Sequence, residues 1–206
     1  MAAVGKLLVY GGTFDPPHMG HMNNLLAVMT AVHPDKVLVM PAGIPPHKAA
    51  SATPAELRLA MCGCFTAVDP CVEVSRWEID QQGRSYTVHT LQMLRDAYPG
   101  TALYLALGSD MLLSFTNWHR WQAILALATL VVQSRAGGDS ADLHAAADAL
   151  KPYGGRVLFA HAVPVPCASS QIRSGSLDAD TLRRVLPESV RAVIRQNGLY
   201  GLADKV

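Results

Sequence analysis

The sequence predicts an α/β fold, a Rossmann-like, doubly wound parallel sheet with helices on both faces. Two observations predict it: short apolar, β-branched runs recur along the 206 residues, and helix-length segments with apolar residues three and four apart separate most of these runs. The alternation indicates successive βαβ units and hence a parallel sheet covered on both sides. A chain of this length is expected to form one domain, 1–206, with a C-terminal helical region at 177–198 packed on it.

The expected strands are residues 7–10, 37–40, 72–79, 102–107, 129–132 and 157–160. The first helix should carry the apolar positions Leu25, Leu26, Met29 and Val32. A capping box with proline at the first helical position is predicted at 53–56, and a surface helix at 139–149. Pro187 predicts the start of a last helix, and Asn197 with Gly198 its end.

Composition excludes several classes of partner. The chain has 17 basic and 16 acidic residues and a formal charge of +1, so no bulk field favours nucleic acid or an anionic membrane. The longest nearly apolar run, 123–132, is about half of the ~20 residues that span a bilayer. We therefore expect a cytoplasmic protein. Its cysteines, without a C-x-x-C pair, are expected to be reduced thiols; a metal site at 62, 64 and 71 is the alternative.

The stretch GGTFDPPHMGH, residues 11–21, follows the first expected strand. Gly11 and Gly12 allow a ligand to approach the backbone, and the helix that begins near His18 offers free N–H groups and a positive dipole end. His18 and His21 lie three apart, on one helix face, where they could meet the same phosphates. The alternatives are a proline-rich turn whose histidines cap or pack, and a zinc site that lacks an apparent third ligand. P-loop and G-x-G-x-x-G motifs are missing, which disfavours a kinase and a redox enzyme.

Further candidates lie in later loops. Residues 169–173, SSQIR, combine hydroxyls, helix N–H groups and Arg173 into a second phosphate site that would face the first; a surface arginine is the alternative. Lys48, in a proline-rich loop, could reach phosphate or be solvated. Residues 85–87, SYT, are expected to cap the helix that follows. Gly108 and Asp110 end a strand where doubly wound sheets bind ligands.

With these motifs the sequence resembles the bacterial nicotinate-nucleotide adenylyltransferases of the nucleotidylyltransferase superfamily, whose signature is G-G-T-F-D-P-x-H-x-G-H. The similarity extends through PPHK (45–48), SYTVHTL (85–91), LGSD (107–110), NWHRW (117–121) and SSQIR (169–173). The resemblance implies adenylyl transfer from ATP to nicotinate mononucleotide, giving deamido-NAD and pyrophosphate. It also implies Mg2+ bound through the ATP phosphates, with no metal ligand assigned to the protein.

The resemblance also implies roles for individual residues. The catalytic residues would be His18, His21, Lys48 and Arg173. The ATP-binding residues would be Gly11, Gly12, Thr13, Phe14, His18, His21, Gly108, Asp110, Ser169, Ser170, Ile172 and Arg173. The residues that bind the pyridine nucleotide would be Ser85, Tyr86, Thr87, Trp118 and Arg135, whereas Trp121 is expected in the core.

Two positions depart from the family pattern: Gln171 stands where threonine is usual, and His89 where aspartate is usual. Asp15 could order the turn or influence magnesium. The alternatives in function are a preference for nicotinamide mononucleotide or another phosphorylated acceptor, such as phosphopantetheine, and a nucleotide-binding regulator without turnover. The partners expected are ATP and nicotinate mononucleotide, without nucleic acid or membrane, and a homo-oligomer is left open.

Overall fold

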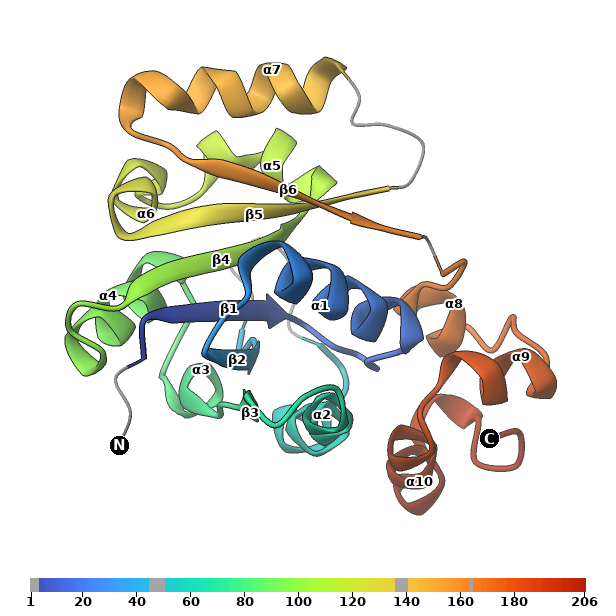
Figure 1. Ribbon diagram of the computed structural model, residues 1–206. Helices are drawn as coiled ribbons and strands as arrows, with labels where there is room; N and C mark the ends of the chain where they lie inside the picture. Colours follow the sequence, from blue (N-terminus) through green and yellow to red (C-terminus); the bar gives the residue numbers. More distant parts are fainter. Residues whose placement is uncertain (1–3, 45–50, 136–140, 164) are drawn as a thin grey trace.

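The computed structural model describes residues 4–44, 51–135, 141–163 and 165–206. In this part of the chain six parallel strands form one sheet in the order β3-β2-β1-β4-β5-β6 (Figure 1). The strands are β1 (Lys6–Gly12), β2 (Lys36–Pro41), β3 (Val72–Val74), β4 (Ala102–Gly108), β5 (Ala128–Arg135) and β6 (Val157–Ala162). The predicted parallel α/β architecture is therefore confirmed.

Helices connect the strands and cover the sheet. They are α1 (Met19–Val32), α2 (Ala55–Cys62), α3 (Trp77–Asp80), α4 (Thr87–Ala97), α5 (Ser109–Leu113), α6 (Trp121–Leu127), α7 (Ala141–Leu150), α8 (Ser169–Arg173), α9 (Ala179–Val185) and α10 (Glu188–Asn197). Short 3-10 turns are η1 (Gly63–Ala67), η2 (Phe115–Asn117), η3 (Lys151–Tyr153) and η4 (Leu199–Gly201). The last helix ends at Asn197 with Gly198 in the left-handed region, as predicted.

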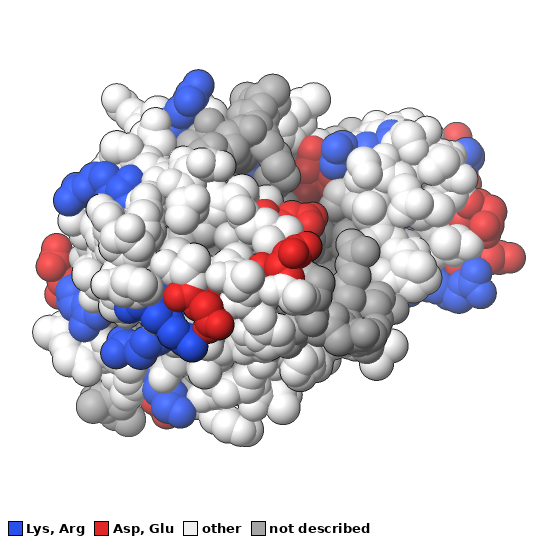
Figure 2. Space-filling view, turned by 90° about the horizontal axis from the view of Figure 1, so that it is seen from above, with Lys and Arg blue, Asp and Glu red and all other residues white. Residues whose placement is uncertain are grey.

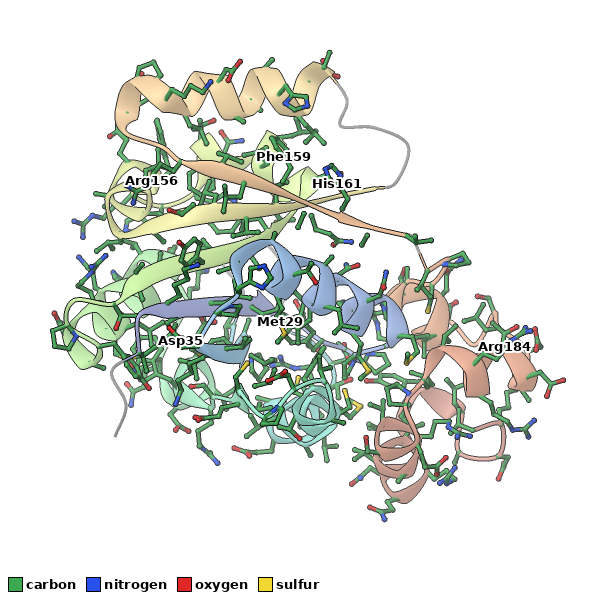
Figure 3. The ribbon with its side chains drawn as sticks, viewed as in Figure 1. Met29, Asp35, Arg156, Phe159, His161 and Arg184 are labelled. Atoms are coloured by element: carbon green, nitrogen blue, oxygen red, sulfur yellow. The ribbon has the colours of Figure 1, made fainter. Side chains whose placement is uncertain are left out.

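Each face of the sheet has its own hydrophobic cluster, because successive residues of a strand point to opposite sides. Leu8 and Tyr10 of β1 pack with α1 and with the C-terminal helices, whereas Leu7 and Val9 pack with α4, α6 and α7. On the second face Phe159 of β6 lies below α7 (Figure 3), where its ring is 4.9 Å from the ring of His144. The sheet is thus buried on both sides, as a parallel sheet requires.

Two local predictions are wrong. The strand expected at 72–79 ends at Val74, and residues Trp77–Asp80 form the helical turn α3. The Ser75 hydroxyl accepts a hydrogen bond from the Trp77 N–H at 3.3 Å, and Arg76 pairs with Asp80 at 3.0 Å across this turn. Both contacts stabilise a helical turn directly after the short edge strand.

The capping box expected at 53–56 does not form. Pro54 is the N-cap of α2, and no side chain caps the helix. Thr53 is instead buried: its carbonyl accepts from Arg58 Nε at 3.4 Å, and its hydroxyl lies 3.4 Å from Tyr200 Oη. Long-range contacts have replaced the local cap.

The strand order indicates where a ligand would bind, at the carboxyl ends of β1 and β4. Strand β1 lies between β2 and β4. From β1 the chain adds β2 and β3 on one side of the sheet, and then β4, β5 and β6 on the other side. In open parallel sheets ligands bind outside the carboxyl ends of the strands at such a switch point. Tyr10 of β1 lies opposite Ala106 of β4, which brings Gly11 and Gly12 beside the end of β4.

Charge is mixed over the surface. On the face drawn in Figure 2, the described Lys and Arg side chains are interspersed with Asp and Glu. Across the described residues no helix has the length and apolar character needed to cross a membrane.

Candidate active site

The turn after β1 is shaped by its glycines and one phenylalanine. Gly11 and Gly12 are the last residues of β1 rather than the first of the loop, and pair with Met40 and Pro41 of β2. A Cβ on Gly12 would lie 2.8 Å from the ring of Phe14, so a larger residue there would require this buried ring to move. Phe14 has a φ of 50° and is 3% exposed. Its side chain therefore packs in the core, and only its backbone could contact a nucleotide.

His18 and His21 form a close pair at the start of α1. Their ring centroids are 3.8 Å apart, and His21 Nδ1 accepts a hydrogen bond from the His18 N–H at 3.3 Å. His18 is 6% exposed, and its Nδ1 has no hydrogen-bond partner in the described structure. A Cβ on Gly20 would lie 2.9 Å from the His18 ring, which explains glycine between the two histidines.

Both imidazoles are neutral near pH 7 in the free protein. Burial lowers the pKa of His18 to about 4. Burial and the adjacent His18 together lower the pKa of His21 to about 3. The Nδ1 atom of His18 is shielded from solvent, so a ligand could contact this ring only through its other atoms. An anion bound there would raise the pKa values that burial lowers.

Helix α8 packs directly against this turn. Ser169 Oγ donates to the Pro16 carbonyl at 2.9 Å, and Arg173 Nη1 donates to the Asp15 carbonyl at 2.6 Å. The structure thus brings SSQIR together with GGTFDPPHMGH. Ile172 is completely buried, so its side chain is excluded from the ligand.

Gln171 has a specific structural role. Its side-chain oxygen accepts from the Ala168 N–H at 2.9 Å and caps the start of α8. The departure from the usual threonine is therefore accommodated at the start of the helix.

Asp15 orders the turn. The carboxylate is 6% exposed and accepts hydrogen bonds from Ser51 Oγ and Tyr200 Oη, both at 2.6 Å. Each of its oxygens thus has a partner from a distant part of the chain. Of the two roles considered for Asp15, the geometry favours ordering the turn over binding magnesium.

A buried arginine joins the ends of β1 and β2. Arg58 is 2% exposed and donates to the carbonyls of Thr13 at 2.9 Å, Ala42 at 2.7 Å and Gly43 at 3.2 Å. The sequence analysis did not identify it, because its position in α2 shows no pattern that distinguishes it from a surface arginine.

The segment Ser85, Tyr86 and Thr87 lies at the same edge of the sheet, but its side chains do not cap α4. Ser85 is buried, its N–H donates to the Ile44 carbonyl at 2.9 Å, and its Oγ accepts from the Gly43 N–H at 3.1 Å. The segment is thus attached to the chain that leaves β2, beside a small pocket that it lines together with Trp77, Arg84 and His89.

Glu78 lies behind this segment and was also missed. It is 9% exposed and accepts from Thr90 Oγ1 at 2.7 Å. Burial raises the pKa of its carboxyl to about 7, against the opposite effect of the Thr90 and Ser85 hydroxyls. The incorrect strand prediction at 72–79 concealed this residue.

The NWHRW segment approaches SYT through its histidine. The ring of His119 lies 4.6 Å from that of Tyr86, and Trp118 packs 5.4 Å from Phe115. Trp121 is partly buried: it packs against the core cluster and lies edge-on to the exposed Tyr153, with ring centroids 4.9 Å apart. The two segments therefore lie together, with Trp118 partly buried between the core and the surface.

Three further residues expected to contact a ligand lie at or just after the ends of β4 and β5. Gly108 ends β4, and Asp110 is exposed in the first turn of α5. Arg135 is the last residue of β5, and its side chain is not described. Lys48 lies outside the described residues.

The cysteines are free thiols. Cys62 and Cys64 are buried and Cys71 and Cys167 partly buried. Burial raises the pKa of all four, which keeps them protonated. Among the residues that the structure describes, no group of three or more His, Cys, Asp or Glu could hold a metal ion.

Comparison with known proteins defines the class first. A family model described as cytidylyltransferase-like matches residues 9–175, which include both phosphate-binding candidates. The chain is therefore a nucleotidyltransferase of the cytidylyltransferase-like class.

Individual relatives narrow this class. The chain is 37% identical over 207 residues to a probable nicotinate-nucleotide adenylyltransferase of Acidithiobacillus ferrooxidans, with 94% of this chain and 95% of that protein aligned. It is 38% identical over 193 residues to a protein of the same name from Roseiflexus sp., with 93% and 96% aligned. The chain belongs to the nicotinate-nucleotide adenylyltransferase family.

A solved structure shows the same fold. Plasmodium falciparum nicotinic acid mononucleotide adenylyltransferase, complexed with NaAD, superposes with a TM-score of 0.72 at 14% identity. The alignment covers 95% of this chain and 97% of that one. The fold is thus retained where most of the sequence differs.

Proposed function

We propose that this chain transfers the adenylyl group of ATP to nicotinate mononucleotide, giving deamido-NAD and pyrophosphate in NAD biosynthesis. The observation that carries the proposal is the paired His18 and His21 at the β1/β4 switch point, with Arg173 packed on the same turn. Family membership supports the choice of reaction.

The transfer is direct. An oxygen of the acceptor phosphate forms a bond to the α-phosphorus of ATP, and the bond from that phosphorus to the bridging oxygen of the β-phosphate breaks. The electron pair leaves with pyrophosphate, so no side chain has to act as nucleophile. Catalysis then consists of alignment and stabilisation of developing charge.

We assign the phosphates to the cationic and imidazole groups. His18 and His21 would contact the α- to γ-phosphates, whose negative charge would raise the pKa values that burial lowers. Arg173 and Lys48 would contact the leaving pyrophosphate as it gains charge. Gly11, Gly12, Gly108 and Ser170 would line the nucleotide with backbone and hydroxyl groups.

Mg2+ fits this site through the nucleotide rather than through the protein. Both Asp15 oxygens have hydrogen-bond partners, and the described residues hold no cluster of metal ligands. The ion, bound to ATP phosphate oxygens, would neutralise part of the charge on the leaving group.

The pyridine end of the acceptor would lie beside Ser85, Tyr86 and Thr87. The free N–H groups at the start of α4 suit a carboxylate, and Trp118 offers a ring for stacking. Arg135, at the end of β5, is a further candidate contact. We also propose that residues 1–206 act as one domain, since α9 and α10 share a hydrophobic cluster with β1.

The test is pyrophosphate release from ATP and magnesium with nicotinate mononucleotide, nicotinamide mononucleotide or phosphopantetheine as acceptor. We expect turnover with the acid substrate, and its loss by about 10²-fold or more in His18→Ala. His144→Ala, at an exposed histidine of α7 whose ring contacts Phe159 rather than the turn after β1, is the matched control and should retain activity. Preference for another acceptor would replace the substrate assignment, and ATP binding without turnover on any acceptor would indicate a regulator.

A further inference from the structure

The turn η4 holds a tyrosine in an unfavourable backbone conformation. Tyr200 has φ 58° and ψ 10°, in the left-handed region, between Gly198 and Gly201, which also have positive φ. A non-glycine residue is strained in this region, and the conformation persists only when its surroundings hold it. The contacts of the Tyr200 side chain must therefore hold the residue in this conformation.

The hydroxyl of Tyr200 contacts the nucleotide-binding turn, 185 positions earlier in the chain. Its Oη donates to Asp15 Oδ1 at 2.6 Å, while Ser51 Oγ donates to the other carboxylate oxygen. Burial alone would raise the pKa of Asp15, but these hydroxyls, Thr53 and the nearby Arg173 lower it below its usual value. Asp15 is thus a buried, ionised carboxylate held on both oxygens.

Arg173 lies close to this carboxylate but is too far away for a hydrogen bond to it. Its Nε is 3.9 Å from Asp15 Oδ2, and its only hydrogen bond described is from Nη1 to the Asp15 carbonyl. The side chain is 42% exposed, so guanidinium donors that the Asp15 carbonyl does not use are in part open to a ligand. A carboxylate released from its hydroxyl partners would gain by forming a two-pronged pair with this guanidinium, which would consume those donors.

We propose that Tyr200 is a positioning residue for adenylyl transfer: its hydroxyl holds the Asp15 carboxylate in place and so keeps the Arg173 guanidinium available to the triphosphate. The inference rests on the role of Arg173 in the proposed function. It adds a residue from the C-terminal turn, whose ring need not touch either substrate.

Tyr200→Phe tests the inference, because it removes one oxygen and keeps the ring. Tyr153→Phe, at an exposed tyrosine, is the matched control. We expect the KM for ATP to rise and kcat/KM for ATP to fall by about tenfold, in line with loss of one hydrogen bond to a charged group. The KM for nicotinate mononucleotide should change less than about twofold, whereas Tyr153→Phe should leave both constants unchanged. A lower melting temperature with unchanged ATP kinetics would overturn the proposal and assign Tyr200 a structural role only.

A double-mutant comparison shows whether the effect passes through Asp15. In an Asp15→Asn background, Tyr200→Phe should change kcat/KM by less than about twofold, because the charged carboxylate is already gone. An equal effect in both backgrounds would contradict the inference. A folded Tyr200→Phe protein is required for either reading, which circular dichroism and a melting curve establish.

The same experiment separates this inference from the proposed function. Wild-type turnover with unchanged ATP constants in Tyr200→Phe overturns the inference alone. Absence of wild-type turnover overturns the proposed function, and the affinity for ATP measured by calorimetry then decides the inference: weaker binding in Tyr200→Phe supports it, and equal binding contradicts it.

Discussion

Replacement of Glu78 by glutamine should change how stability depends on pH. Glu78 is a buried carboxyl whose Oε1 accepts from Thr90 Oγ1, and burial raises its pKa to about 7 from an ordinary value of 4.5. Glutamine keeps the shape and an acceptor oxygen but cannot ionise. Glu78→Gln therefore removes the titration and little else.

The sign and size follow from the two pKa values. Between pH 4.5 and 7 the folded protein keeps a proton that the unfolded chain has lost, so this group makes the free energy of unfolding fall as pH rises, and its effect is constant above pH 7. The difference of about 2.5 units corresponds to about 3 kcal/mol at 1.36 kcal/mol per unit. Between pH 5 and pH 8, Glu78→Gln should gain about 2–3 kcal/mol relative to the wild type.

Urea unfolding followed by circular dichroism at pH 5, 6, 7 and 8 measures this gap. Glu73→Gln, at an exposed glutamate paired with Lys36, is the control and should follow the wild type within about 0.5 kcal/mol at every pH. A constant difference between Glu78→Gln and the wild type across this range would show that Glu78 is ionised in the folded protein, and would refute the reasoning.

Three further predictions concern the nucleotide site and its support. ATP binding at pH 6.5 should take up protons, up to about one for each of His18 and His21, because a nearby phosphate raises the pKa values that burial has lowered to about 4 and about 3. Calorimetry in buffers of different ionisation enthalpy measures the proton uptake, and a heat of binding that is the same in all buffers would contradict the prediction. Arg58→Met should lower the free energy of unfolding by about 3–5 kcal/mol, seen as a fall of roughly 6–20 °C in Tm, since it leaves buried carbonyls without a donor. A change below about 1 kcal/mol would show that water replaces the guanidinium. Trp118→Ala should raise the KM for nicotinate mononucleotide by about tenfold and leave the KM for ATP within about twofold; equal effects on both would exclude stacking on the pyridine ring.

The sequence predicted the sheet well because its signals are local. Runs of β-branched residues located five of the strands closely, and the order of strands and helices determined the parallel arrangement. The edge strand β3 was misjudged, since the turn formed by Ser75 and Arg76 depends on side-chain contacts that apolar patterns do not reveal.

The sequence predicted the parts of the site that lie within one segment of the chain, and missed residues that act through distant segments. The spacing of His18 and His21 follows from helix geometry, and their rings do lie together. Arg58, Glu78 and Tyr200 function through partners far away in the sequence, so no local pattern distinguishes them from ordinary surface or core residues.

The hydrogen bond between Asp15 and Tyr200 has a consequence for biosynthesis. A ribosome makes the nucleotide-binding turn early, yet the hydroxyl that completes it is 185 positions further along. The backbone hydrogen bonds within helices α1 and α4 are local and can form while synthesis continues, but this turn is completed only after Tyr200 has been synthesised. Nascent or C-terminally shortened chains would therefore carry an unfinished nucleotide site, and would also lack the side chains of α9 and α10 that cover β1 on one face of the sheet.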